Sequence, residues 1–148
     1  MNSKMKIAFG CYFLSGLVSM GFGMVYLFRT EFMPYHSVAV GMSWAEVPPN
    51  FQVLILALMK AVGGTSITLA LVLFAVLFMP FRQGARWAIV SIPLIGLFQS
   101  AAMLYAMSQV ALHTSARPPI WVTGTGMALL LLAFILSLSG TNLPESKT

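Results

Sequence analysis

Four long apolar stretches without a charged residue constrain this chain more than any other feature. They cover residues 7–28, 61–81, 87–112 and 120–138. A helix needs about 20 apolar residues to cross the hydrocarbon core of a bilayer, which matches the length of these stretches. None of them alternates between polar and apolar residues as the strands of a membrane barrel do. The sequence therefore predicts an all-α integral membrane protein, a four-helix bundle in a single domain.

The composition supports this class, and the apolar stretches give the expected bounds of the elements. Only 7% of the residues are charged and the mean hydropathy is +0.90, whereas soluble domains carry roughly 25% charged residues. We expect transmembrane helices at about 7–28, 51–79, 87–111 and 119–138, a connection over 29–50 and a loose tail over 141–148. The first stretch is too long for the apolar region of a signal peptide, and no Ala-x-Ala site follows it, so we expect it to remain as an anchor.

The distribution of cationic residues predicts the orientation, because lysine and arginine in short connections favour the cytoplasmic side. One side of the expected bundle carries Lys4, Lys6, Arg82, Arg86 and Lys147, and the other carries Arg29 and Arg117. We therefore expect an up-down-up-down order with both termini in the cytoplasm, in a bacterial inner membrane. The net charge of +5 then reflects orientation, and nucleic acid is not an expected partner because no basic stripe with interleaved aromatic residues is present.

The connection over residues 29–50 is too long and too aromatic for a simple tether, so we predict a structured outer loop. Ser43 and Glu46 have the spacing of a capping box, but the prolines that follow would break a helix, so we expect none there. Those prolines or Asn50 are the expected start of the second membrane helix. Pro80 is expected to end it, and the tight basic turn that follows would make helices two and three an antiparallel hairpin.

Two helix faces carry small or polar residues at a spacing of four, which suits close helix packing. The residues assigned to packing are Cys11, Ser15, Ser19 and Gly23 on the first helix and Gly64 and Thr68 on the second. The second face also includes Lys60, and we expect it to look into the bundle; a polar ligand channel between the two faces is the alternative. Lys60 itself lies at the outer interface if the helix ends near Met79, or near the midplane if the helix enters the membrane at Phe51.

The third helix places Gln99 and Gln109 on one face. An amide in lipid costs free energy unless it is hydrogen-bonded, so we expect Gln99 to form an interhelical hydrogen bond, with substrate contact as the alternative.

Most of the polar side chains fall on the expected outer side, which makes that side the candidate surface for a ligand or partner. The candidate residues are Tyr35, His36, Trp44, Glu46, Lys60, Gln109 and His113. We predict a non-catalytic accessory or binding subunit whose outer loop contacts a lipid, a small ligand, another membrane protein or a second copy of the chain. A transporter or channel subunit is an alternative.

Soft-metal handling is a further alternative. Met20 and Met24, and likewise Met103 and Met107, stand four residues apart, and thioether with imidazole ligands suits Cu(I). The spacing resembles the Met-x-x-x-Met of copper-transporter helices, over five residues only. The sequence assigns no metal or cofactor site, and Cys11 is the only cysteine, so no disulfide forms within the chain. A pairing of Glu46 with His36 or His113 would suit acid–base chemistry, but no catalytic motif is present and we predict no enzyme.

Overall fold

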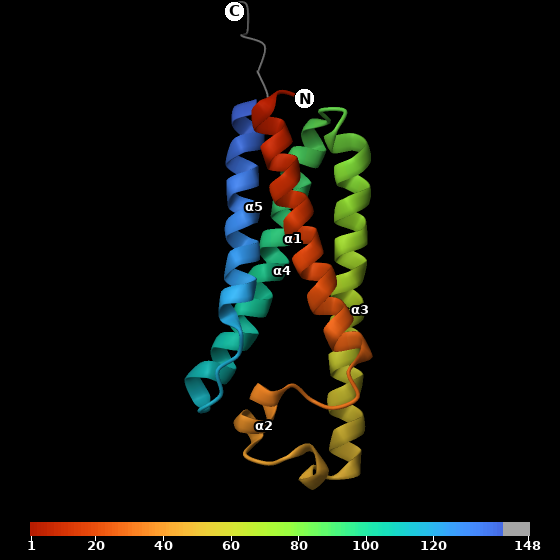
Figure 1. Cartoon of the computed structure of the whole chain (residues 1–148), viewed down its shortest axis with the longest axis vertical. Helices are drawn as coiled ribbons and strands as arrows, with labels where there is room; N and C mark the ends of the chain where they lie inside the picture. Colours follow the sequence, from red (N-terminus) through yellow and green to blue (C-terminus); the bar gives the residue numbers. More distant parts are fainter. Residues whose placement is uncertain (141–148) are drawn as a thin grey trace, which may run out of the picture.

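The computed structural model describes residues 1–140, which contain helices and no strand (Figure 1). Its long helices are α1 (Ser3–Phe28), α3 (Pro49–Val76), α4 (Arg86–His113) and α5 (Ile120–Gly140). With the short η2 turn added to α3, all four are long and apolar enough to cross a membrane. The all-α class and the four potential spans are therefore confirmed, while the predicted tail over 141–148 lies outside the described residues.

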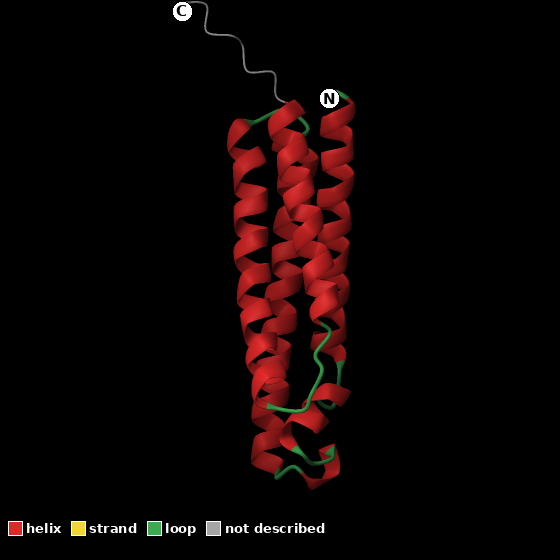
Figure 2. Cartoon of the chain, turned by 90° about the vertical axis from the view of Figure 1, so that its left-hand side faces the viewer, coloured by secondary structure: helices red, strands yellow, loops and turns green. Residues whose placement is uncertain are grey.

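The first and last described helices meet at one end of the bundle, which we call the terminal end. There the side chain of Asn2 donates a hydrogen bond to the carbonyl oxygen of Gly140 across 2.8 Å. The connection between α1 and α3 lies at the opposite end, and Figure 2 shows the four long helices side by side between these two ends. We call residues 29–48 the cap segment and this end the cap end.

Local capping explains where the helices begin. The side chain of Asn2 accepts a hydrogen bond from the Met5 backbone N–H at 3.0 Å, so α1 starts at Ser3, earlier than residue 7. Pro49 opens α3 at a first-turn position, as expected from the prolines. The expectation that Pro80 ends this helix is wrong, because the chain continues through Pro80 in a π-turn, η2 (Leu77–Phe81). Gly84, with φ of 76°, then makes the turn into α4.

The helices do not pack as four equivalent neighbours. α1 packs along both α3 and α5, and α5 packs along α4, whereas α3 and α4 touch only sparsely outside the turn that joins them. The expected hairpin of the second and third membrane helices is therefore connected but not closely packed. The internal space of the molecule therefore lies beside the gap between α3 and α4.

The closest crossing in the bundle joins the backbones of α1 and α3. A Cβ atom added to Gly23 would lie 2.8 Å from the carbonyl oxygen of Gly63, and one added to Gly63 would lie 2.6 Å from the backbone nitrogen of Leu27. Only glycine permits this approach. The expected packing face of α3 is wrong by one position, because Gly64 has open space at its Cβ and Thr68 is exposed.

The side chains pack into two separate cores. The larger core lies towards the terminal end and surrounds Tyr12, Leu77, Phe81 and Leu130. The smaller core lies at the cap end, where Tyr26, Phe32, Val47 and Met59 pack together. We expected the first connection to cover the start of α3. The cap segment covers the face that carries Met59, but it leaves Phe51, Val53, Leu54 and Leu58 more than half exposed.

The cap segment contains two short helices, α2 (Pro34–Val40) and η1 (Trp44–Glu46). No helix was expected at Ser43 and Glu46, but their capping box is present. Oε2 of Glu46 accepts hydrogen bonds from both the backbone N–H and the hydroxyl of Ser43, each at 2.7 Å. The prolines at 48 and 49 limit the capped helix to a single turn, η1, and do not prevent its start. Gln52 of α3 ties this turn to the long helix, because its Nε2 donates to Trp44 O at 2.9 Å and to Val47 O at 3.0 Å.

Candidate functional site

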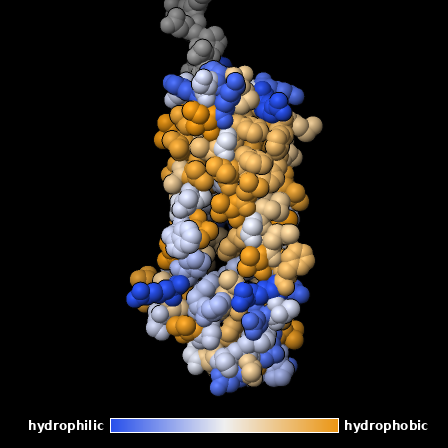
Figure 3. Space-filling view, in the orientation of Figure 1, coloured by the Kyte–Doolittle hydropathy of each residue, from blue (hydrophilic) through white to orange (hydrophobic). Residues whose placement is uncertain are grey.

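A cavity lies between the two cores, where α3 and α4 do not meet. It holds about 630 Å³ of empty space counted out to its open mouth, and all four long helices line it. Its polar lining consists of Ser15 and Ser19 from α1, Ser66 from α3, Gln99 and Ser100 from α4, and Thr123 from α5. Leucine, valine, methionine, phenylalanine and alanine side chains and two glycines form the rest of the wall, and no charged residue among residues 1–140 takes part. The surface is hollowed on the face seen in Figure 3, above the cap segment.

Two of these six side chains donate a hydrogen bond within residues 1–140, and Gln99 is one of those that do not. The hydroxyl of Ser19 donates to the carbonyl oxygen of Ser66 at 3.2 Å, and the hydroxyl of Thr123 donates to the Met107 sulfur at 3.7 Å. Gln99 is half-buried and borders the cavity, but its amide forms no hydrogen bond with any residue in 1–140. The expected interhelical hydrogen bond of Gln99 is therefore absent from the described chain, and its amide donors and acceptor are free to meet a ligand.

A smaller space of about 300 Å³ continues the gap between α3 and α4 towards the terminal end. It shares Leu69, Leu73 and Gly96 with the cavity and reaches Ser91, whose hydroxyl oxygen is buried without a hydrogen-bond partner among residues 1–140. Both spaces have mostly apolar walls with scattered neutral polar groups. Such walls suit a molecule with a long apolar part.

The cap segment closes the other end of the molecule with an aromatic cluster. Tyr26 of α1 and Tyr35 of α2 are joined by a hydrogen bond between their hydroxyl groups. The Tyr35 and His36 rings lie 4.3 Å apart edge to face, and Phe32 and Trp44 lie 5.0 Å apart in the same manner. The structure therefore brings three of the predicted surface residues, Tyr35, His36 and Trp44, into one half-buried cluster.

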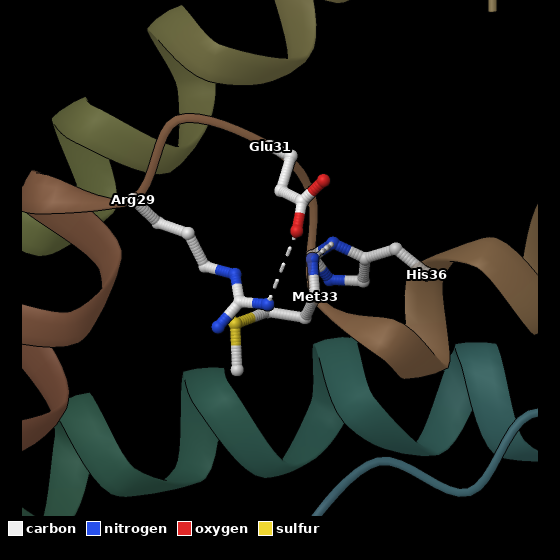
Figure 4. A network of polar contacts seen from close by, with 4 residues as sticks. All are labelled: Arg29, Glu31, Met33 and His36. Carbon is white, nitrogen blue, oxygen red and sulfur yellow. Dashed lines mark hydrogen bonds and ion pairs between the residues drawn. The ribbon is translucent and has the colours of Figure 1, made fainter. Parts of the chain in front are cut away.

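Burial and nearby charge set the protonation of this cluster. His36 Nδ1 accepts a hydrogen bond from the Met33 backbone N–H at 3.3 Å, and Figure 4 shows its ring beside the Arg29 side chain. Burial, and then the charge of Arg29, lower the pKa of His36, so its ring is neutral at pH 7. Burial raises the pKa of the Tyr35 hydroxyl, while its hydrogen bond with Tyr26 acts in the opposite direction. The hydroxyl and the backbone N–H of Ser43 lower the pKa of Glu46.

The remaining predicted surface residues lie apart from this cluster and are exposed. They are Glu46, Lys60, Gln109 and His113. The carboxylate of Glu46 accepts a hydrogen bond from the hydroxyl of Ser43, and Nδ1 of His113 lies 2.9 Å from the carbonyl oxygen of Gln109. The predicted outer surface is therefore not one continuous site.

The residues named in the enzyme and copper alternatives are placed as follows. Within residues 1–140, neither histidine forms an ion pair with a carboxylate, and no three His, Cys, Asp or Glu residues are placed to hold a metal ion. Met103 lines the cavity and Met107 is buried beside Thr123, whereas Met24 is 46% exposed. Neither His36 nor His113 lines the cavity with Met103.

Part of the cavity lining was predictable from the sequence. Ser15 and Ser19 were assigned to packing, with a polar channel as the alternative, and Gln99 was expected to be a bonded amide, whereas Ser66, Ser100 and Thr123 were not predicted as lining residues. Neutral polar residues at the same depth on four predicted membrane helices are the pattern that indicates a shared internal site.

Comparisons with protein-family models, with functionally characterised proteins and with solved structures found no match for this chain. The candidate function therefore depends on the geometry of the cavity and the cap segment.

Proposed function

We propose that this protein is a non-catalytic membrane protein that binds a lipid-like molecule in the cavity between its four long helices. The observation that carries the proposal is an open cavity with an apolar wall, six neutral polar residues and, within residues 1–140, no charged residue. Apolar walls with a few placed hydrogen-bonding groups are typical of small-molecule sites. An accessible amide at Gln99 gives the bound molecule a neutral hydrogen-bonding partner.

The same proposal includes the membrane topology. The helices cross a bacterial inner membrane in alternating directions, with both termini in the cytoplasm and the cap segment outside. Exposed Lys4, Lys6, Arg82 and Arg86 support this placement, because all four lie on the helix ends or the turn at the terminal end. Lys147, which contributes to the same prediction, lies outside the described residues.

The close crossing of α1 and α3 supports an interfacial position for Lys60. Gly63 is level with Leu27, so Lys60 lies about 4.5 Å further towards the cap end, just past the end of α1 at Phe28. With η2, α3 covers 33 residues, or about 50 Å, against a hydrocarbon core of about 30 Å. The start of α3 therefore projects from the membrane, and the cap segment packs on this projection.

A cavity-filling substitution tests the binding function. Ser100→Phe places a large side chain in the cavity, whereas Ala101→Phe places the same side chain on the exposed face of the same helix. Protein extracted gently from its own membrane is examined by native mass spectrometry, with metal content measured on the same sample. We expect a copurifying lipid mass on the wild-type protein and on Ala101→Phe, and its loss from Ser100→Phe. Equal lipid retention by both variants would refute cavity binding.

Gln99→Leu tests the polar contact without filling the cavity. Because a hydrogen bond in a membrane interior contributes about 1 kcal/mol, we expect roughly fivefold weaker retention of the bound molecule. Gln109→Leu is the matched control, because Gln109 is exposed on the same helix. A copurifying polypeptide in place of a lipid would favour the accessory-subunit role, and a copper mass would favour metal handling.

A further inference from the structure

Arg29 directly follows α1. Its guanidinium group is partly shielded from water, and the nearby carboxylate neutralises its positive charge only weakly. Its closest anionic group is Oε1 of Glu31, 3.8 Å from a terminal guanidinium nitrogen, which is too long for a hydrogen bond. Its Nε atom is buried and has no hydrogen-bond partner within residues 1–140. Figure 4 shows the guanidinium group between the cap segment and a neighbouring long helix.

The other groups around Arg29 supply no negative charge. His36 lies opposite on α2 and is kept neutral by burial and by Arg29 itself. The hydroxyl groups of Tyr26 and Tyr35 form a hydrogen bond with each other. The Glu31 side chain is 55% exposed, so water screens its attraction to Arg29. Within residues 1–140, the Arg29 guanidinium therefore has one long ion pair and no hydrogen bond, so its terminal N–H groups can donate to another molecule.

Arg29 also follows a cavity-lining segment of α1 in the chain. Phe22 lines the cavity, and α1 continues from it for about 9 Å towards the cap end before it ends at Phe28, directly before Arg29. At that depth Arg29 is level with Lys60 and the proposed outer interface, where lipid headgroups lie. An amphiphile with its head at this level has its tail at the level of the cavity.

We propose that the molecule bound in the cavity is an anionic membrane lipid whose phosphate group accepts hydrogen bonds from Arg29 while an acyl chain enters the cavity. This inference rests on the proposed function and adds the class of headgroup. A guanidinium group presents parallel N–H donors that match phosphate oxygens, and charge-assisted bonds of this kind are stronger than neutral ones. The apolar cavity wall and the unsatisfied cation at its outer end together fit an anionic head and an apolar tail.

The test uses the full-length protein in nanodiscs that contain phosphatidylglycerol and phosphatidylcholine with identical acyl chains. Native mass spectrometry after release measures which lipid remains bound. We expect the wild-type protein to retain phosphatidylglycerol preferentially and Arg29→Gln to lose this preference by roughly tenfold or more, the value of one charge-assisted hydrogen bond. Arg29→Lys keeps the charge without the paired donors, so we expect an intermediate preference.

Arg117→Gln is the matched control, because Arg117 is an exposed cation between α4 and α5 that does not line the cavity. The inference is wrong if the wild-type protein shows no lipid preference, or if Arg29→Gln and Arg117→Gln lower it equally. Ser100→Phe separates the two proposals. If that variant loses both lipids while the wild-type protein retains them without preference, cavity binding holds and the headgroup assignment fails. If that variant retains both lipids, cavity binding fails and the headgroup proposal fails with it.

Discussion

The crossing of α1 and α3 makes a sharp prediction, because two adjacent glycines in α3 have opposite surroundings. A Cβ at Gly63 would lie 2.6 Å from the Leu27 backbone nitrogen and 2.8 Å from the Gly23 carbonyl oxygen, and backbone atoms cannot rotate away as side chains do. Gly63→Ala must therefore separate the two helices. Overpacking of this kind costs about 1–3 kcal/mol, which for a chain of this length corresponds to roughly 2–12 °C in the midpoint of thermal unfolding.

Gly64→Ala is the matched control, since nothing lies within 4 Å of its Cβ position. Alanine is the better helix former, so we expect this variant to be as stable as the wild-type protein or slightly more stable. The assay is thermal unfolding of the purified protein in detergent, followed by circular dichroism and by recovery of the monodisperse species after heating. Equal midpoints for Gly63→Ala and the wild-type protein, or an equal loss in both variants, would refute the close crossing.

Two further predictions concern the cap segment. Gln52→Leu leaves the carbonyl oxygen of Val47 without its donor and removes one of the two donors of the Trp44 carbonyl oxygen, so we expect proteolysis within residues 29–48 to accelerate while the four long helices stay intact, with the exposed Asn50→Ala as control. Because the folded protein lowers the pKa of His36, the unfolded state binds more protons, and the contribution of His36 to stability is present above about pH 6.5 and is lost as the pH falls towards its folded pKa. We expect the cap segment to exchange amide hydrogens faster at pH 5.5 than at pH 7.5, measured with correction for the intrinsic rate. His36→Gln should reduce this dependence and His113→Gln should not; an unchanged dependence in His36→Gln would contradict the assignment.

The number and approximate positions of the long helices were predictable, because they depend on runs of apolar residues. The four apolar stretches located α1, α3, α4 and α5, and the prolines before Asn50 indicated the start of α3. The capping box of Ser43 and Glu46 was visible in the sequence too, but the prolines that follow it favoured the prediction of no helix there. A proline prevents continuation of a helix and does not prevent a single capped turn before it.

The packing face of each helix was harder to predict. In a soluble helix, the contrast between polar and apolar sides identifies the buried face, but lipid and protein interior are both apolar. Gly63 and Gly64 are adjacent, and only the three-dimensional crossing distinguishes them. The gap between α3 and α4 is likewise a consequence of how three helix pairs meet, and no local pattern in the sequence encodes it.

The crossing and the cavity have a common cause. Gly23 and Gly63 hold α3 against α1, while Gly96 admits Leu130 and so holds α4 against α5. Because α3 and α4 are each bound to a different partner, the space between them must be filled by side chains or left open. The residues that face it from α1, α3 and α4 include Ser15, Ser66 and Ser100, which are too small to fill it. The serines that leave the cavity open are also polar, so the same residues that create the space supply hydrogen-bonding groups to whatever occupies it.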